Sequence, residues 1–266
     1  MIKLSIVIPV YNEEERLEKT FTALKQGVVS DVFQISEVIF VDDGSRDNTK
    51  KLINTWIKQN TSKKTAYRLI SYGENRGKGY AVKAGMLDAQ GDYILFMDAD
   101  MSTPLPELLK MQPVMLEKKD VIIGTRKNGH STVIKHQPLY RELLGKAFTL
   151  LSNIITNTWV TDFTCGFKVF SHKAAQQVFS RARIERWGYD AEILFIAKNL
   201  GMSMKEVPVV WANDDRSKVN LMKALPQTLG ELYTIRANAI KGLYNFKKGS
   251  LLSNFKPALQ WLSTFI

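Results

Sequence analysis

Residues 93–100 read YILFMDAD, a run of five apolar side chains followed at once by two aspartates that flank an alanine. A run that is apolar throughout is typical of a strand buried on both faces of a parallel sheet. Residues 4–10 and 37–41 form two more runs that are nearly all apolar, and carboxylates follow closely after each. Because ligands of open parallel sheets bind beyond the carboxyl ends of the strands, the sequence predicts a site at that edge.

Helical patterns, with apolar side chains at spacings of three and four, separate these runs along the chain. The expected helices cover residues 13–26, from 47 onward, 79–89, 139–155, 190–199 and 221–245. Further strands are expected at residues 67–71, 121–124 and 206–211. This alternation predicts an α/β fold with a mostly parallel, Rossmann-like sheet that is flanked by helices.

Composition and charge limit the function classes. The chain has 266 residues, 45% of them hydrophobic, which suits one large domain or one domain with a modest extension. A formal net charge of +11 favours an anionic partner, which could be a phosphate-bearing ligand, phospholipid or nucleic acid. The single cysteine, Cys165, excludes an internal disulfide and fits a reducing compartment such as the cytosol. No apolar stretch reaches 18 residues, so no transmembrane helix is predicted, and the first residues are expected to form a strand, not a signal peptide.

Asp98 and Asp100 are the first candidates for chemistry. Residues two apart in an extended segment project to the same side, and two carboxylates so placed repel each other unless a cation lies between them. Mg²⁺ and Mn²⁺ take oxygen ligands and commonly bridge to substrate phosphates, so the pair is a candidate metal site. The alternative is a solvated turn ahead of a helix near Pro104, with Ser102 or Thr103 as the helix cap.

Two loops are candidates for binding a ligand beside this pair. A carboxylate of Asp42 or Asp43 could accept hydrogen bonds from a nucleobase or a ribose, although aspartate followed by glycine is also common in plain turns. The stretch NRGKG at 75–79 places Lys78 between glycines at the start of an expected helix, where an anion is favoured. A simple junction between loop and helix is the alternative, because the stretch matches neither a Walker A loop nor a dinucleotide-binding motif.

Taken together and in this order, the stretches resemble family 2 glycosyltransferases, which have the GT-A fold. The resemblance rests on PVYNEE (9–14), VDDGSRDNT (41–49), NRGKGYAVKAG (75–85) and FMDADMS (96–102). It continues in segments that look like polyprenyl-phosphate sugar synthases: GTR (124–126), YRELLGKAF (140–148), TDFTCGFKVF (161–170), RWGYDAEILF (186–195) and RSK (216–218). The dolichyl-phosphate β-glucosyltransferases look most similar, and the dolichol-phosphate mannose synthases come next. The similar part covers about residues 3–220.

The resemblance implies a role for each matching position. The donor, a nucleotide diphosphate sugar (UDP-glucose, or else GDP-mannose), would be bound by Pro9, Tyr11, Glu13, Val41, Asp42, Asp43 and Ala99. Asp98 and Asp100 would hold a divalent metal ion, Mg²⁺ or Mn²⁺, and Ser102 stands where some relatives have a glutamine. Arg126, Arg141 and Lys218 would contact the phosphates of donor and acceptor. The implied reaction is a metal-dependent, inverting transfer of one hexose to a polyprenyl or dolichyl phosphate.

The nature of the acceptor decides whether a general base is needed. A lipid phosphate is ionised near pH 7 and can attack without a strong base, whereas a hydroxyl group of a glycan or protein needs one. Asp190 and Glu192 are the candidates for that base in this alternative function, although acidic residues are also favoured in the first turn of a helix. Lys168 is a further candidate for a phosphate contact. Cys165 is expected to be a packed small residue and not a nucleophile.

The end of the chain predicts contact with a membrane. We expect a catalytic domain over residues 1–220 and a helical, basic extension over 221–266. After Glu231 the chain has five cations and no acid, and its last residues mix aromatic and aliphatic side chains. This pattern favours attachment to an anionic membrane surface from the cytoplasmic side, with a solvated helix and a frayed tail as the alternative. A membrane-anchored partner subunit is another route to the membrane.

Nucleic acid is not expected as a partner, because the cations are scattered among acidic strand ends and no recognised motif is present. A scaffold without catalysis is disfavoured by the complete set of aspartates and arginines.

Overall fold

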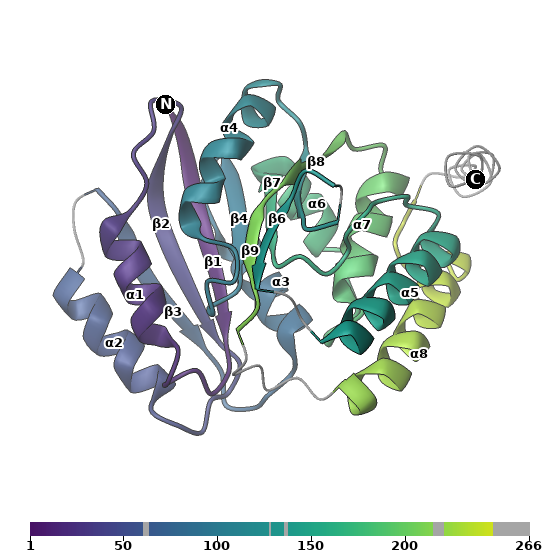
Figure 1. Cartoon of the computed structure of the whole chain (residues 1–266), viewed down its shortest axis with the longest axis horizontal. Helices are drawn as coiled ribbons and strands as arrows, with labels where there is room; N and C mark the ends of the chain where they lie inside the picture. Colours follow the sequence, from purple (N-terminus) through teal and green to yellow (C-terminus); the bar gives the residue numbers. More distant parts are fainter. Residues whose placement is uncertain (61–63, 128, 136–137, 215–220, 247–266) are drawn as a thin grey trace.

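The computed structural model describes residues 1–60, 64–127, 129–135, 138–214 and 221–246. In this part of the chain a seven-stranded sheet forms the centre of the molecule, with helices on both faces (Figure 1). From edge to edge its strands are β3 (Ala66–Ser71), β2 (Phe33–Asp42), β1 (Ile2–Val10), β4 (Tyr93–Met97), β7 (Phe167–Ser171), β5 (Val121–Thr125) and β8 (Met204–Pro208). The α/β fold predicted from the sequence is therefore confirmed.

The sheet is mostly parallel, as predicted, and β7 is the exception. Strand β1 runs parallel to β2 and β4, and β5 runs parallel to β8. Strand β7, which was not predicted, is antiparallel to both β4 and β5 and lies between them. Because β7 enters the sheet at the carboxyl end of β4, the residues just before β7 lie beside the residues just after β4. The amide of Asp98 donates to the carbonyl oxygen of Gly166 at 3.2 Å.

The helices divide between the two faces of the sheet. In chain order they are α1 (Leu17–Gln26), α2 (Thr49–Asn60), α3 (Lys78–Asp88), α4 (Leu108–Leu116) after a short 3₁₀ turn η1 (Leu105–Glu107), α5 (Leu139–Thr156), α6 (His172–Phe179), α7 (Tyr189–Asn199) and α8 (Leu221–Ile240). One apolar core packs α1, α2 and α4 against the sheet. The other packs α3, α6, α7 and α8 against the opposite face.

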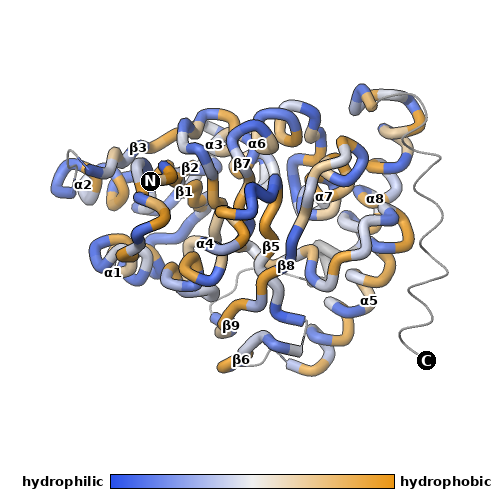
Figure 2. Tube along the Cα trace, turned by 90° about the horizontal axis from the view of Figure 1, so that it is seen from above, coloured by the Kyte–Doolittle hydropathy of each residue, from blue (hydrophilic) through white to orange (hydrophobic). Residues whose placement is uncertain are grey.

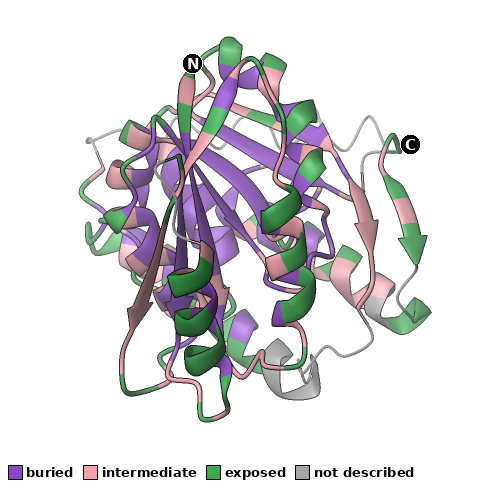
Figure 3. Ribbon diagram, turned by 90° about the vertical axis from the view of Figure 1, so that its left-hand side faces the viewer, coloured by how far each residue is buried: buried purple, intermediate pink, exposed green. Residues whose placement is uncertain are grey.

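Strand β4 illustrates why an unbroken apolar run was needed. Leu95 belongs to the core beneath α1, α2 and α4, whereas its neighbour Phe96 belongs to the core on the other face. Both side chains are fully buried. Figure 3 shows the same pattern along the central strands, which are buried almost throughout. Burying each such side chain stabilises the fold by roughly 1.5–3 kcal/mol, so the central strands anchor the loops at their carboxyl ends.

A small second sheet lies beside the carboxyl edge of the large one. It pairs β6 (Thr132–Lys135) with β9 (Val210–Ala212) in parallel (Figure 2). The strand predicted over residues 206–211 is in fact two strands in two different sheets. The break falls at Val209, whose amide donates to the carbonyl oxygen of Thr125 at 3.1 Å and so turns the chain from one sheet to the other.

Helices α5 and α8 lie side by side at one end of the molecule (Figure 1). The expected helix over 221–245 is present but ends at Ile240, and Gly242 follows with a φ of 72°. Leu232 and Ile235 of α8 are fully buried in the core, so this helix is an integral part of the fold. The division of the chain at residue 220 remains a prediction. Within the described ranges, the helices are all too short or too polar to span a bilayer.

Candidate active site

A pocket of about 910 Å³ opens at the carboxyl ends of β1, β4 and β5, where the sequence predicted a site. Eleven of the predicted residues line it: Pro9, Tyr11, Glu13, Asp43, Lys78, Asp98, Ala99, Asp100, Ser102, Arg126 and Asp190. They come from segments more than 180 residues apart in the chain, and the parallel strands bring them together. The pocket is large enough for a nucleotide sugar and part of an acceptor.

Asp98 and Asp100 lie in the wall of this pocket immediately after β4. The Asp98 carboxylate is 2.5 Å from the ammonium group of Lys78, and the Asp100 carboxylate is 3.7 Å from the guanidinium of Arg16. Burial, together with the charge of Asp98, raises the pKa of Asp100 above its usual range. The amide of Ser102 donates to Asp100 at 2.9 Å, and hydrogen bonds from the backbone and side chain of Ser102 act against this rise in pKa.

The carboxylate of Asp98 rests directly on Gly166, in the loop before β7. A Cβ atom on Gly166 would lie 2.1 Å from Oδ2 of Asp98, so any larger residue would displace the carboxylate from this position. Glycine lets the carboxylate approach the backbone this closely. This contact has no local signal in the sequence, because the two residues are far apart in the chain and β7 brings them together.

The two aspartates fit a divalent metal ion. Both side chains are partly exposed to the pocket, at 33% for Asp98 and 21% for Asp100. The described residues contain no cluster of three or more histidine, cysteine, aspartate or glutamate side chains arranged to hold a metal. One or two carboxylates, completed by water and substrate phosphates, are how Mg²⁺ is usually bound at phosphate-transferring sites. Such a donor set suits an ion that binds together with its substrate.

Asp43 lines the pocket, but its carboxylate is already engaged by the NRGKG loop. It accepts hydrogen bonds from the backbone amides of Arg76 and Gly77, at 2.8 and 2.9 Å, and from the side-chain amide of Asn75 at 2.8 Å. Gly44 turns the chain next to it with a φ of 71°, a conformation that favours glycine. Asp43 thus holds the loop that presents Lys78 to Asp98.

Asp42 and Val41 were predicted as donor-binding residues, and neither lines the pocket. The Asp42 carboxylate is buried and accepts hydrogen bonds from the amide of Ser45 and the hydroxyl of Ser71, both at 3.0 Å. Val41 is fully buried in the core beneath α3. Successive strand residues point to opposite faces, so only part of a strand-end motif can reach a ligand.

Glu13 and Arg16 form a second charged group near Asp100. The Glu13 carboxylate receives two hydrogen bonds from the guanidinium of Arg16, one of them at 2.5 Å from Nε. Arg16 also lines the pocket and was not predicted from the sequence. Its position three residues after Glu13, one helical turn on, is the local signal that could have identified it.

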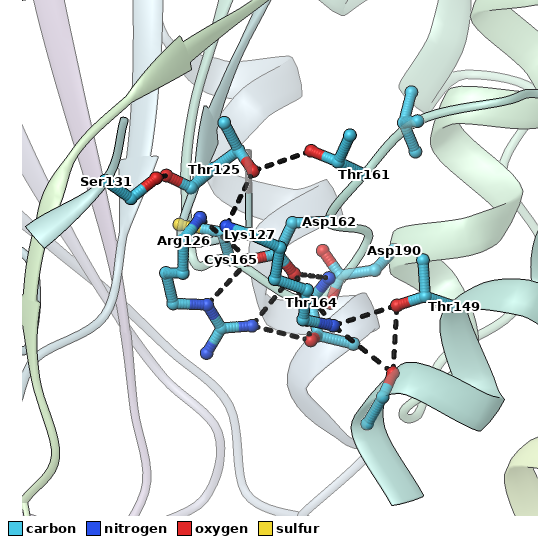
Figure 4. Close-up of polar contacts among 12 residues, drawn as sticks. Thr125, Arg126, Lys127, Ser131, Thr149, Thr161, Asp162, Thr164, Cys165 and Asp190 are labelled. Carbon is cyan, nitrogen blue, oxygen red and sulfur yellow. Dashed lines mark hydrogen bonds and ion pairs between the residues drawn. The ribbon is translucent and has the colours of Figure 1, made fainter. Parts of the chain in front are cut away.

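Arg126 is held by a buried carboxylate that the sequence analysis missed (Figure 4). Asp162 is fully buried and accepts from Nε of Arg126 at 2.7 Å and from Nη2 at 2.9 Å. The same guanidinium donates to the hydroxyl of Thr164 at 2.9 Å and lies 5.2 Å from the ring of Trp211. Burial opposes ionisation, but Arg126 and Lys127 outweigh it, so the pKa of Asp162 lies well below its usual range. The guanidinium is thereby fixed with one edge toward the pocket.

Lys127 stands beside Arg126 and was also missed. Its ammonium group donates to the hydroxyl of Thr149 at 2.9 Å and to the carbonyl oxygen of Gly145 at 3.2 Å, both on α5 (Figure 4). Burial, and then the charge of Arg126, lowers the pKa of Lys127, while Asp162 at 3.8 Å opposes that shift. This basic wall lies in the same pocket as the wall that carries Asp98 and Asp100.

Lys168 does not reach the pocket, contrary to the suggestion that it could face a phosphate. It is fully buried and donates to Asp190 at 2.6 Å and to the carbonyl oxygen of Cys165 at 2.7 Å. Asp190 does line the pocket, and burial raises its pKa although Lys168 and Lys78 act in the opposite direction. Cys165 is buried, and its burial raises the pKa of the thiol to about 11, in line with a packed residue and not a nucleophile.

Glu192, the other candidate for a base, points away from the pocket. Its carboxylate accepts from the amides of Arg183 and Ile184, at 2.9 and 2.8 Å, and from the hydroxyl of Tyr244 at 2.7 Å. Residues two positions apart on an α-helix are rotated by about 200° around its axis, so Asp190 and Glu192 face opposite sides of α7. Glu192, a candidate base only for the alternative function, does not line the pocket. Arg141 lies in α5 but its side chain is outside the described structure, as is Lys218, so their phosphate contacts stay predictions.

Known proteins resemble this chain both in sequence and in fold. The sequence model of glycosyl transferase family 2 matches residues 5–179. The dolichyl-phosphate beta-glucosyltransferase of Dictyostelium discoideum is 32% identical over 92% of this chain and 77% of that protein, and that of Drosophila melanogaster is 33% identical over 91% and 77%. A crystal structure of glucosyl-3-phosphoglycerate synthase from Mycobacterium tuberculosis, in complex with Mn²⁺, UDP-glucose and phosphoglyceric acid, has a TM-score of 0.62 and 18% identity, over 93% of this chain and 81% of that one. At that identity the likeness concerns the fold.

Proposed function

The chain belongs to glycosyl transferase family 2, and we propose that it transfers glucose from UDP-glucose to the phosphate of a dolichol or another polyprenol. The observation that carries the proposal is a single pocket with two unlike walls, one with Asp98 and Asp100 and one with Arg126 and Lys127. A donor diphosphate with its metal ion suits the first wall, and an acceptor phosphate suits the second. The names of the similar proteins support glucose and dolichyl phosphate as the substrates.

On the donor side, Asp98 and Asp100 would hold Mg²⁺ or Mn²⁺, which when bound stabilises the charge on the leaving diphosphate. Tyr11 and Pro9 give the pocket a flat apolar wall that suits a nucleobase. Asp43 fixes the loop that carries Lys78, so the Lys78 ammonium group stays within reach of the diphosphate. Ala99, Glu13 and Ser102 complete this half of the pocket.

On the acceptor side, Arg126 and Lys127 would bind the lipid phosphate and orient one of its oxygens toward the anomeric carbon. That oxygen forms a bond to the carbon as the bond from the carbon to the β-phosphate oxygen of UDP breaks, which inverts the configuration. A phosphate monoester has its second pKa near 6, so it is largely ionised at neutral pH and no proton has to be removed. The pairing of Arg126 with Asp162 supplies a guanidinium of fixed orientation for this contact.

The acceptor also implies a membrane. A polyprenyl phosphate resides in a bilayer, so we infer that the protein acts at the cytoplasmic face of a membrane, by its own surface or through a membrane-anchored partner subunit. The tail at 247–266, for which sequence analysis predicted membrane contact, lies outside the described residues.

The proposal is tested by a donor screen. Purified protein is incubated with UDP-glucose, GDP-mannose and other nucleotide sugars, a short polyprenyl phosphate, and Mg²⁺, Mn²⁺ or EDTA, and products are identified by mass spectrometry. We expect glucosyl phosphoryl polyprenol from UDP-glucose in the presence of either metal, and none with EDTA. A product from GDP-mannose alone would overturn the choice of donor.

A second candidate function is transfer to a hydroxyl group of a glycan or protein. Asp190 favours it, because this carboxylate lines the pocket and its pKa is raised. The variant Asp190→Asn separates the two. The second function would be selected by two results together. The unchanged protein would transfer the sugar to a hydroxyl acceptor and not to polyprenyl phosphate, and Asp190→Asn would lose that transfer.

A further inference from the structure

Helices α5 and α8 carry the densest set of exposed apolar side chains in the described part of the chain. Nine of the seventeen large apolar residues exposed there lie on these helices or in the turn after α8: Leu139, Tyr140, Leu143, Leu150, Ile154, Leu229, Tyr233, Ile240 and Leu243. Tyr233 is 74% exposed and Ile240 is 82% exposed. We refer to these nine residues as the α5–α8 apolar face. A surface of this kind on a protein marks a contact with something apolar.

On α5 the exposed apolar residues follow one stripe. At 100° per residue, Leu139, Leu143, Leu150 and Ile154 fall within an arc of roughly 60°. The other side of the helix is buried, for example at Ser152. An ordinary surface helix has one apolar side, which faces the core, and a charged side toward water. Helix α5 departs from that pattern on its water side.

Helix α8 shows the same arrangement. Leu229, Tyr233 and Ile240 fall within an arc of roughly 40°, while Leu232 and Ile235 face the core. The two helices pack against each other at one end of the molecule (Figure 2), and each of them carries such a stripe. Apolar side chains on both sides of two adjacent helices indicate a second apolar contact outside the core.

The same two helices carry the α5–α8 apolar face and part of the lining of the active-site pocket. Leu144 and Phe148 of α5 and Thr228 of α8 line the pocket, and Leu143 and Leu229 directly adjoin them in the chain. Cations lie among the exposed apolar residues. Lys146 and Lys241 are exposed, and the half-buried Arg236 lies beside the stripe formed by Leu229, Tyr233 and Ile240, roughly 20° outside its arc. The face is therefore apolar with a basic component, which complements an anionic lipid surface.

We propose that the α5–α8 apolar face lies against a bilayer that contains anionic lipids, with its apolar side chains in the boundary between head groups and acyl chains. Amphipathic helices bind membranes in this way, parallel to the surface. The identity of the acceptor rests on the proposed function, whereas the binding of the face to lipid does not. In this orientation a lipid phosphate reaches the basic wall of the pocket while its apolar chain stays in the bilayer.

Two other occupants are less well matched by charge. In a two-fold dimer built on this face, Arg236, Lys146 and Lys241 would oppose the same cations of the second copy. Residues 247–266 contain three lysines and no acid, so they offer these cations no counter-charge either. An anionic lipid surface is the occupant whose charge is opposite.

The test uses the full chain and vesicles of phosphatidylcholine with or without phosphatidylserine. The face variant combines Leu150→Gln, Ile154→Gln, Tyr233→Ser and Ile240→Gln, none of which lines the pocket. The matched control makes four apolar-to-glutamine changes at exposed positions elsewhere: Val29, Leu52, Leu109 and Leu116. We expect vesicle flotation of the face variant to fall by at least roughly tenfold, and that of the control to match the unchanged protein. Circular dichroism and the melting temperature establish that both variants fold.

Each further outcome is decisive. Equal flotation of the face variant and the unchanged protein would overturn the proposal. So would a dimer of the unchanged protein that the face variant dissociates, or vesicle binding that appears only when residues 247–266 are deleted. Transfer of glucose to a short soluble acceptor is measured in parallel and should be the same in both variants. If no transfer occurs but flotation still depends on the face, the proposed function fails and the lipid-binding face stands.

Discussion

Three charged side chains that line the pocket, Asp98, Arg126 and Asp190, each pair with a side chain of opposite charge. Lys78 pairs with Asp98, Arg126 with Asp162, and Lys168 with Asp190. Asp98 and Arg126 differ in how they are held: the first is partly exposed to the pocket, and the second is fixed from behind by a carboxylate that no solvent reaches. The carboxylate wall can therefore exchange its partner for a ligand, whereas the guanidinium keeps its partner and its orientation.

We expect Asp98→Asn and Asp100→Asn each to lower kcat/KM by roughly a hundredfold to a thousandfold, because each removes a ligand for the charge-stabilising metal ion. Neither should unfold the protein, since the change removes one of two like charges. Steady-state kinetics with Mg²⁺ and thermal melts test both statements. Near-normal turnover by the two variants would remove the metal site from this position.

Gly166→Ala should abolish most activity, although Gly166 is far from Asp98 in the sequence. The added methyl group would overlap the Asp98 carboxylate, which must then shift away from its position. Gly73→Ala is the matched control, because a Cβ there meets no atom within 4 Å. We expect a fall in kcat of roughly a hundredfold or more for the first variant and little change for the second. Equal activity of the two would mean that the position of Asp98 is not critical.

Asp162 should act through Arg126, and a double-mutant cycle measures this. Arg126→Ala is expected to lower kcat/KM by roughly tenfold to a thousandfold, as for the loss of one charged phosphate contact. Asp162→Asn should lower kcat/KM in the unchanged protein but have little further effect when Arg126 is already alanine. Effects that simply add in the double variant would show that Asp162 supports the fold in general and not the guanidinium.

At the scale of whole elements, the predictions succeeded where a local pattern is sufficient. Strand β4 was predicted with its observed bounds, because a run that is apolar on both faces needs no partner to be identified. Strand β7 was missed because Lys168 interrupts its apolar pattern. That lysine is tolerated in the core because Asp190, on α7, neutralises it, and such a long-range pair leaves no local signal.

The candidate site shows the same limit. Residues at strand ends were correctly expected to gather at one edge, but the spacing could not tell which of them face the pocket. The Asp42 carboxylate is buried and accepts a hydrogen bond from Ser45 in its own loop, and Glu192 lies on the opposite side of its helix from Asp190. Asp162 and Gly166 were missed as site residues because each acts on a residue in another part of the chain.

The contact between α7 and the segment after α8 gives a prediction for stability. Tyr244→Phe removes the hydroxyl that donates to the buried Glu192 carboxylate at 2.7 Å. We expect a loss of about 1–3 kcal/mol in the free energy of unfolding, measured in urea, because a buried charged acceptor loses a donor. Activity at 25 °C should not change, since neither side chain lines the pocket. Tyr233→Phe, on the exposed side of α8, is the control and should have no effect on stability.

At the scale of the whole molecule, the net charge of +11 predicts how the protein responds to salt. Deleting residues 247–266 removes three lysines and no acid, each lysine contributing about 1 kcal/mol near an anionic surface. We expect weaker sedimentation with anionic vesicles and slower transfer to long-chain acceptors, both most evident at low salt. Transfer to a short soluble acceptor serves as the control and should stay the same. If the shortened protein sediments as well as the full chain, the tail has no part in lipid binding.

The antiparallel strand β7 has a consequence for how the protein is made. Strands β1 to β4 all come from the first hundred residues and are joined by successive parallel crossovers, so they can pair as soon as they leave the ribosome. The partner that completes the edge of β4 is about 70 residues further on, which at typical rates of synthesis is a delay on the order of 4–14 seconds. During that interval β4 has one unpaired edge, and its apolar residues are exposed to association with other chains. The corner that seats Asp98 on Gly166 is thus assembled late, and chaperone dependence should be greatest while the chain between β4 and β7 is being synthesised.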